Sequence, residues 1–334
     1  MKKSHVLQAS FLSTVGVFAL AVFLWPSDAF AWGPLAHLSF SQAALADLSA
    51  VSPALRLILS QFASEFLYGS LAADIIVGKN LARYEVHCHN WNTGFQVLNR
   101  AKNDSQRAFG LGFLSHLAVD TIAHNYYVPY KTVQGHSARA AGHAYWEIRY
   151  DQRLSPDLWR VARHVTQRQY REHDEHLEEC LSESYVIPFS ISKTLFGSML
   201  LSARLKKWQR MSEVIAGERD LYLTDEEIGE CRNLAVANIV DMLKRGPDAD
   251  CVQIDPTGER NLSMATRLRK ELKNREDLSL KEKDAFARQT RPSFRNAIWG
   301  RLNLPELPDV QPVPAPARNE LRRNELRRNV LFDS

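Results

Sequence analysis

The sequence has little of what builds β-sheets or thiolate metal sites. Its 334 residues include only 15 glycines, 14 prolines and four cysteines. Stretches in which apolar and polar residues alternate are scarce. Half-buried strands need that alternation, so a sheet fold is disfavoured. No two cysteines have C-x-x-C spacing, so neither a zinc–thiolate motif nor a dithiol redox motif is supported.

The chain instead has helical periodicity. Apolar residues recur about every 3.6 positions from residue 36 onwards. Hydrophobic residues make up 45% of the chain, which is enough for a sizeable core. We therefore expect an all-α domain. The predicted helices lie near residues 36–48, 52–66, 92–102, 105–126, 137–154, 156–167, 187–203 and 225–245.

The longest apolar run lies at the N-terminus. Lys2 and Lys3 precede it, and it ends in Ala-Phe-Ala, a small-x-small cleavage site at residues 29–31. We predict a signal peptide over residues 1–31, Trp32 as the mature N-terminus, and a periplasmic or secreted protein. The alternative is a retained anchor, because the run approaches the length of a bilayer span. Export would permit up to two disulfides, in a pairing that the sequence leaves open, among Cys88, Cys180, Cys231 and Cys251.

Basic charge is concentrated at the C-terminal end. The net charge is +4, from 42 basic and 38 acidic residues, and the basic excess falls after residue 257. Glycine, proline and aspartate are dense over residues 241–258, which indicates a boundary near residue 250. The expected parts are a main domain at 32–250, a charged helical extension at 251–303 and a Pro-rich, basic tail at 304–334. We expect a solvated tail, with contact to anionic lipid head groups as the alternative.

Three polar side chains that are costly to bury share one face of the apolar segment LGFLSHLAVDTIAHNYY, residues 111–127. His116, Asp120 and His124 stand at i, i+4 and i+8, so their side chains span roughly 80° of a helix. An aspartate between two histidines is expensive to bury without a cation, so the row is predicted to bind metal. His143 and Glu147 form a second i, i+4 pair. Imidazole and carboxylate without thiolate favour zinc, with manganese as the alternative.

The order of these residues along the chain resembles a known family. Four further residues precede the row: Trp32, His37, Asp74 and His89. With His-x3-Asp, a later His and His-x3-Glu, this order resembles the bacterial zinc-dependent phospholipase C family, whose helical fold is shared with the P1/S1 nucleases. The resemblance covers about residues 32–150 by motif and extends to 245 by helix content. It implies an all-α domain with three bound zinc ions.

The resemblance assigns ligands to the first two zinc ions. The α-amine and carbonyl oxygen of Trp32 would bind one ion together with His37. Asp120 would bridge this ion to a second one, which His89 and His116 would hold. His87 is the alternative to His89.

The third zinc ion would be bound by His124, His143 and Glu147. Only three residues separate Asp120 from His124, whereas family members usually have five. His136 is therefore an alternative ligand at this site.

Asp74 matches the acidic residue that the family uses as a general base or to orient the attacking water. The implied activity is that of a zinc-dependent phosphodiester hydrolase. The first candidate is a phospholipase C that acts at a membrane surface and releases diacylglycerol and a phosphorylated head group through a metal-bound hydroxide. The alternatives are a P1/S1-type nuclease or nucleotidase acting on nucleic acid, and a non-catalytic metal- or membrane-binding module. No obligate protein partner is expected.

Two further groups have open roles. Aromatic residues near the ligands either line a substrate pocket or pack helices: Trp91, Tyr126, Tyr127, Tyr130 and Trp146. Three histidines lie in a charged stretch and are expected to face solvent: His164, His173 and His176.

Overall fold

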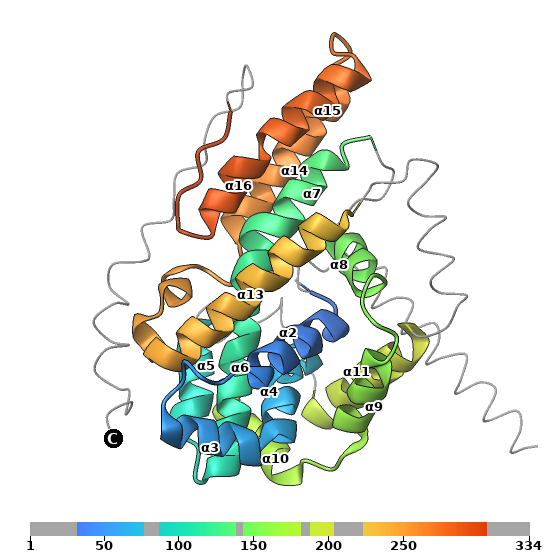
Figure 1. Cartoon of the computed structure of the whole chain (residues 1–334). Helices are drawn as coiled ribbons and strands as arrows, with labels where there is room; N and C mark the ends of the chain where they lie inside the picture. Colours follow the sequence, from blue (N-terminus) through green and yellow to red (C-terminus); the bar gives the residue numbers. More distant parts are fainter. Residues whose placement is uncertain (1–31, 77–86, 138–142, 182–187, 204–222, 306–334) are drawn as a thin grey trace, which may run out of the picture.

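The computed structural model describes residues 32–76, 87–137, 143–181, 188–203 and 223–305, and within these ranges it contains helices and no strand (Figure 1). The all-α prediction is thus confirmed. In order, the elements are α2 (Pro34–Ala46), α3 (Pro53–Gln61), α4 (Ala63–Ile75), α5 (Trp91–Asn99), α6 (Asp104–Ile122), the π-helix η3 (Ala123–Tyr127), α7 (Val128–Gln134), α8 (His143–Asp151), α9 (Leu158–Gln167), α10 (Arg171–Leu181), α11 (Phe189–Ala203), α13 (Asp225–Arg245), the 3-10 turns η4 (Gly246–Asp248) and η5 (Asp250–Gln253), α14 (Glu259–Asn274), α15 (Leu280–Gln289) and α16 (Arg291–Ala297). The predicted signal peptide and nearly all of the predicted tail lie outside the described residues.

Local capping explains where the main helices begin. The Asn103 side chain accepts a hydrogen bond from the Gln106 N–H at the start of α6. Thr224 and Glu227 form a reciprocal capping box at the start of α13. Each predicted helix is present to within several residues, but the predicted helix over 52–66 is divided into α3 and α4. The division falls at Phe62, whose φ of −115° and ψ of 39° are not helical.

The predicted helix over 105–126 changes character before it ends. From Ala123 the chain continues as a π-helix, and the Val128 N–H donates to the Ala123 carbonyl five residues earlier. Pro129 follows and has no N–H to give to the Asn125 carbonyl, so an α-helical ladder is interrupted here. Single π-helical turns of this kind are frequent at functional sites.

The centre of the fold is α6, which packs against α4, α5 and α13. Its side chains are buried on every face from Ala108 onwards, as expected for a helix surrounded by others. At one end of the molecule, α14, α15 and α16 gather around α7, while α3 and α10 lie at the opposite end (Figure 1). Residues 251–303 therefore pack onto η3 and α7, and the predicted division near residue 250 stays a prediction.

Two glycines bring the backbones of α4 and α6 into direct contact. A Cβ at Gly69 would lie 2.0 Å from the Phe109 carbonyl oxygen, and a Cβ at Gly112 would lie 2.0 Å from the Phe66 carbonyl oxygen. Real Cβ atoms do not approach that closely, so only glycine allows this helix separation. The carbonyl groups of α4 thereby come within reach of side chains on α6.

The segment before α2 is fixed through the Trp32 side chain. The indole is fully buried, and its Nε1–H donates to the Val119 carbonyl oxygen at 3.3 Å. It stacks on Tyr127 at 4.6 Å between ring centroids and meets Tyr150 edge-on at 4.3 Å. Residue 32 is therefore anchored beside the end of α6.

The last residue of α8 caps the start of α2. The Asp151 carboxylate accepts hydrogen bonds from the Leu35 N–H at 3.1 Å and the Ala36 N–H at 2.9 Å. Gly33 leaves room for it, because a Cβ there would lie 2.1 Å from Asp151 Oδ2. Burial raises the pKa of the Asp151 carboxyl to about 7, although the two N–H groups favour its ionised form.

The four cysteines are buried as free thiols, and the structure forms no disulfide among them.

The three histidines of the charged stretch differ in exposure. His164 is exposed as expected, but His173 and His176 are buried. His173 is 3.0 Å from Ser105 Oγ, and His176 donates to the Val97 carbonyl oxygen at 2.8 Å. No helix in the described ranges combines the length and apolar character needed to cross a membrane.

A Gly112→Ala variant should be destabilised by about 1–3 kcal/mol, because the added methyl group forces α4 and α6 apart. Chemical denaturation followed by circular dichroism measures the loss. Gly229→Ala on α13 is the matched control, since no atom lies within 4 Å of its added Cβ. That helical substitution should leave stability unchanged or raise it by up to about 1 kcal/mol. Equal effects of the two substitutions would contradict the close contact.

Asp151 should make stability fall as pH rises. In the unfolded chain its carboxyl ionises near pH 4, whereas in the folded chain it keeps its proton up to about pH 7. Unfolding therefore releases a proton between these values, and the free energy of unfolding drops by about 1.4 kcal/mol per pH unit until it levels off above pH 7. Urea titrations with chelator present, from pH 5 to 8, measure the free energy of unfolding of wild type and Asp151→Asn. The difference between the two should change with this slope up to about pH 7. Parallel curves would contradict the raised pKa.

Candidate metal centre

Five buried side chains from three helices and one loop converge around Asp120. Within α6, the one-turn spacing places His116 Nε2 3.2 Å from Asp120 Oδ2. From the loop before α5, His89 Nε2 lies 3.3 Å from Asp120 Oδ2. From α2, His37 Nε2 lies 3.4 Å from Asp120 Oδ1. Asp74, in the last turn of α4, completes the set, which we term the Asp120 centre.

Asp74 faces the same two imidazoles as Asp120 Oδ2. Its Oδ1 is 3.4 Å from His89 Nε2 and 3.8 Å from His116 Nε2. Both carboxylates and all three histidines of the centre are at most 3% exposed. Among the described residues, His37–His116–Asp120 and Asp74–His89–His116 are two triads whose ligand atoms all lie within 4.8 Å of one another. Two candidate ligand groups thus lie side by side and have His116 in common.

The spacing and the hydrogen bonding of these atoms fit a divalent cation. Two ligands at 2.0–2.1 Å from one tetrahedral zinc ion stand roughly 3.3 Å apart, which is the separation seen here. Within the described part of the chain, neither ring nitrogen of His37 and neither oxygen of Asp120 makes a hydrogen bond. Burying such polar atoms without partners is costly, and a shared cation removes that cost.

Second contacts of the histidines aim their Nε2 atoms at the centre. His116 Nδ1 lies 2.9 Å from the Ser70 carbonyl oxygen. A carbonyl only accepts, so Nδ1 carries the proton and Nε2 presents a lone pair. This is the usual arrangement behind a metal-bound histidine. The close approach of α4 and α6 at Gly69 and Gly112 brings the Ser70 carbonyl within reach.

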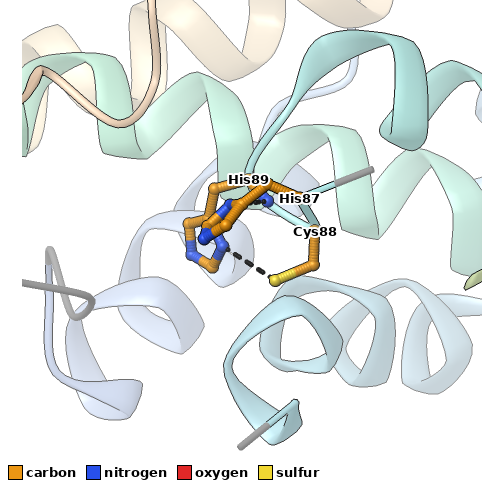
Figure 2. Close-up of side chains that lie close together, drawn as sticks. All are labelled: His87, Cys88 and His89. Carbon is orange, nitrogen blue, oxygen red and sulfur yellow. Dashed lines mark hydrogen bonds between the residues drawn. The ribbon is translucent and has the colours of Figure 1, made fainter. Parts of the chain in front are cut away.

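Within the segment His87–Cys88–His89, hydrogen bonds join His89 to each of the other two residues (Figure 2). His87 Nδ1 accepts a hydrogen bond from the His89 backbone N–H at 3.1 Å. Cys88 Sγ lies 3.2 Å from His89 Nδ1, so that His89 Nε2 faces Asp74, His116 and Asp120. His87, Cys88 and His89 also form a possible ligand group of their own, but the contacts of His89 Nε2 favour His89 over His87 at the Asp120 centre.

Electrostatics favour an ionised Asp120 and a neutral His37. Burial alone would raise the pKa of the Asp120 carboxyl, but the neighbouring imidazoles of His116 and His37 hold it well below its usual range. Burial lowers the pKa of His37, as does the proximity of His116. An ionised carboxylate and neutral imidazoles are the forms that bind zinc.

A second group, which we term the His124 cluster, joins η3 to α8. The rings of His124 and His143 meet edge-on with their centroids 4.8 Å apart. His143 Nε2 lies 3.1 Å from Glu147 Oε1, one turn along α8. His136 instead lies 2.9 Å from Asp284 Oδ1, which favours His124 as the ligand. The ring of His124 thus meets His143, and His143 meets Glu147, but the three are not among the possible ligand groups found within the described residues. Their role as ligands stays a prediction.

The aromatic residues near the ligands pack helices. All five are buried. Trp91 Nε1–H donates to the Ile254 carbonyl oxygen, and Tyr127 OH donates to the Trp146 carbonyl oxygen. Tyr126 OH donates to Glu230. Of the two roles considered from the sequence, packing is the one that these contacts support.

Sequence reasoning missed four groups around these sites. Asp151 had a visible signal, since it extends His143 and Glu147 by another four residues on α8. Cys88 stood beside His89 in the sequence but was considered only as a disulfide partner. The carbonyl oxygens of Ser70 and Pro256 gave no signal, because backbone acceptors are the same at every position.

Comparison with known proteins agrees with this arrangement. No curated protein and no solved structure matches the chain. Residues 36–194 match the model of the family described as zinc dependent phospholipase C. The matched region contains every residue of the Asp120 centre and of the His124 cluster. This match confirms the resemblance of residues 36–194 to the zinc-dependent phospholipase C family.

Proposed function

We propose that this protein is a phospholipase C that hydrolyses glycerophospholipids to diacylglycerol and a phosphorylated head group. Its family and its clustered histidines and aspartates support the broader class, a zinc-dependent phosphodiester hydrolase. The observation that carries the proposal is the Asp120 centre, in which two carboxylates and three imidazoles are gathered in the core and, among the described residues, neither Asp120 oxygen makes a hydrogen bond.

Asp120 has the geometry of a bridging ligand. Its Oδ1 faces His37, and its Oδ2 faces His89 and His116. One carboxylate can therefore join two cation sites, one on each side. The anchored Trp32 would complete the His37 side with its backbone α-amine and carbonyl, once the preceding residues are removed. This role requires export and cleavage before residue 32, which we include in the proposal.

Zinc bound in such paired sites polarises phosphoryl oxygens and brings the pKa of a water molecule close to neutral. The chain supplies the rest of the chemistry. Asp74 adds a second carboxylate at the centre and would accept the proton that the attacking water loses. His124, His143 and Glu147 would hold a third ion near the leaving oxygen, which gives the family's count of three.

The substrate class is tested directly with the exported, processed protein. Incubation with phosphatidylcholine vesicles should release diacylglycerol, and a chelator should abolish the release because the site residues need the cation. Single-stranded DNA is the parallel substrate. Release of mononucleotides without diacylglycerol would replace the proposal by a P1/S1-type nuclease. Absence of both products would leave a metal- or membrane-binding module.

An Asp74→Asn variant should lower kcat by roughly 10²–10⁴-fold, as expected for loss of a general base. Steady-state rates on saturating lipid measure the effect, and Asp47→Asn, an exposed aspartate at the end of α2, is the control. Zinc per chain, measured on the same samples, separates two causes. If Asp74→Asn binds as much zinc as wild type, the loss of rate is assigned to proton transfer by Asp74. If the variant lacks one ion, Asp74 is assigned as a metal ligand. Full activity in Asp74→Asn would remove it from the site.

A further inference from the structure

The strongest unassigned feature is a turn from the C-terminal part of the chain that touches His124. Residues 254–258, with the sequence IDPTG, connect η5 to α14 and lie outside the segment that matches the family model. Pro256 and Gly258 are buried against the π-helix η3. We term these five residues the 254–258 turn.

Three consecutive carbonyl groups of this turn accept hydrogen bonds from residues at or next to metal-ligand candidates. The Ile254 carbonyl accepts from Trp91 Nε1 at 2.8 Å, two residues after His89. The Asp255 carbonyl accepts from Asn125 Nδ2 at 2.9 Å. The Pro256 carbonyl accepts from His124 Nδ1 in a short hydrogen bond. The turn therefore contacts both ligand-bearing regions through its backbone.

The contact with Pro256 fixes the state of the His124 ring. Since the carbonyl only accepts, Nδ1 carries the proton and Nε2 has the free lone pair. Among the described residues, His124 Nε2 is buried and makes no hydrogen bond. The ring of His143 stands edge-on beside it. His124 thus has the pattern of a metal ligand whose second nitrogen is held by a backbone oxygen.

The turn is rigid for local reasons. Asp255, Pro256 and Gly258 occupy the positions at which a type I turn favours aspartate, proline and glycine. The Gly258 N–H donates to the Asp255 carbonyl at 3.2 Å, and the Asp255 carboxylate accepts from the Thr257 N–H and hydroxyl at 3.0 and 2.7 Å. A preformed turn loses little conformational entropy when it holds a side chain.

Gly258 also sets the distance between the turn and η3. Its φ of 55° is left-handed, and a Cβ there would lie 2.4 Å from the His124 carbonyl oxygen and 2.5 Å from the His124 Cβ. Asn261, at the start of α14, adds a second connection because its Nδ2 donates to Asn125 Oδ1 at 2.7 Å. Any side chain at position 258 would push His124 away from the Pro256 carbonyl.

We propose that the 254–258 turn is a positioning element for His124, so that the C-terminal part of the chain completes one metal site of the family domain. The inference rests on the proposed function, because it takes His124 as a ligand. It explains how this chain uses a histidine only four residues after Asp120. The turn, together with Asn261, supplies the orientation that an unsupported π-helical turn lacks.

The test measures zinc binding rather than turnover. Zinc per chain is determined by elemental analysis after equilibration with graded chelator, for wild type and the variants His124→Ala, Gly258→Ala, Asn261→Ala and Gly300→Ala. Gly300 is the matched control, since its φ of 75° gives a similar backbone strain but its added Cβ would lie an ordinary 3.6 Å from the nearest atom, Ile254 Cδ1. Thermal denaturation of all variants reports folding.

His124→Ala should lose one zinc ion relative to wild type. Gly258→Ala should bind that same ion about 10–100-fold more weakly, the usual effect of removing an outer contact of a ligand. Asn261→Ala should show a smaller loss at the same ion, and it replaces Gly258→Ala if that variant does not fold. Gly300→Ala should keep all zinc.

Wild-type zinc affinity in both Gly258→Ala and Asn261→Ala, while His124→Ala loses an ion, would overturn the role of the turn and leave the proposed function intact. Retention of every zinc ion in His124→Ala would instead overturn the assignment of the His124 cluster, and the inference with it.

Discussion

The organisation of this protein depends on one buried carboxylate. Asp120 lies on a helix that is enclosed on all sides, and its oxygens face three imidazoles from three separate segments. Two of them, His116 and His37, keep the pKa of its carboxyl well below the usual range, so the carboxylate stays ionised near neutral pH. A cation held between α2, α4, α6 and the loop before α5 would offset the free-energy cost of burying this charge. The packing of these segments and the candidate metal centre thus meet at one residue.

Backbone carbonyl groups do much of the orienting around this charge. The Ser70 carbonyl holds His116, the Val119 carbonyl holds the Trp32 indole, and the Pro256 carbonyl holds His124. Each carbonyl belongs to a helix or a preformed turn, so its position is set by many hydrogen bonds rather than by one rotamer. The glycine contact between α4 and α6 is what makes the first of these interactions geometrically possible. The orientation of the side chains at the centre therefore depends on closely packed helices.

The sequence was informative where chemistry follows local geometry. Pairs four residues apart, such as His116 with Asp120 and His143 with Glu147, face together in any α-helix, and the structure places them so. The density of histidines and acidic residues drew attention to His37, Asp74 and His89, and the family resemblance gave them roles. Three features could not be predicted, because they depend on contacts between distant segments. The first is the division of a helix at Phe62, and the second is the burial of His173 and His176 against α6 and α5. The third is the set of backbone carbonyl groups that contact the histidine side chains.

The change from α6 to η3 explains why one row of side chains serves two clusters. Along an α-helix His124 lies about 6 Å beyond Asp120. At that distance its ring does not reach the side chains around Asp120, and it lies instead beside His143 of α8. In the wider π-helical turn each residue also rotates less about the axis than in an α-helix. The His124 ring then faces His143, while His116 and Asp120 share the first centre. In this π-helical turn the His124 ring has a contact from outside the helix, the Pro256 carbonyl oxygen.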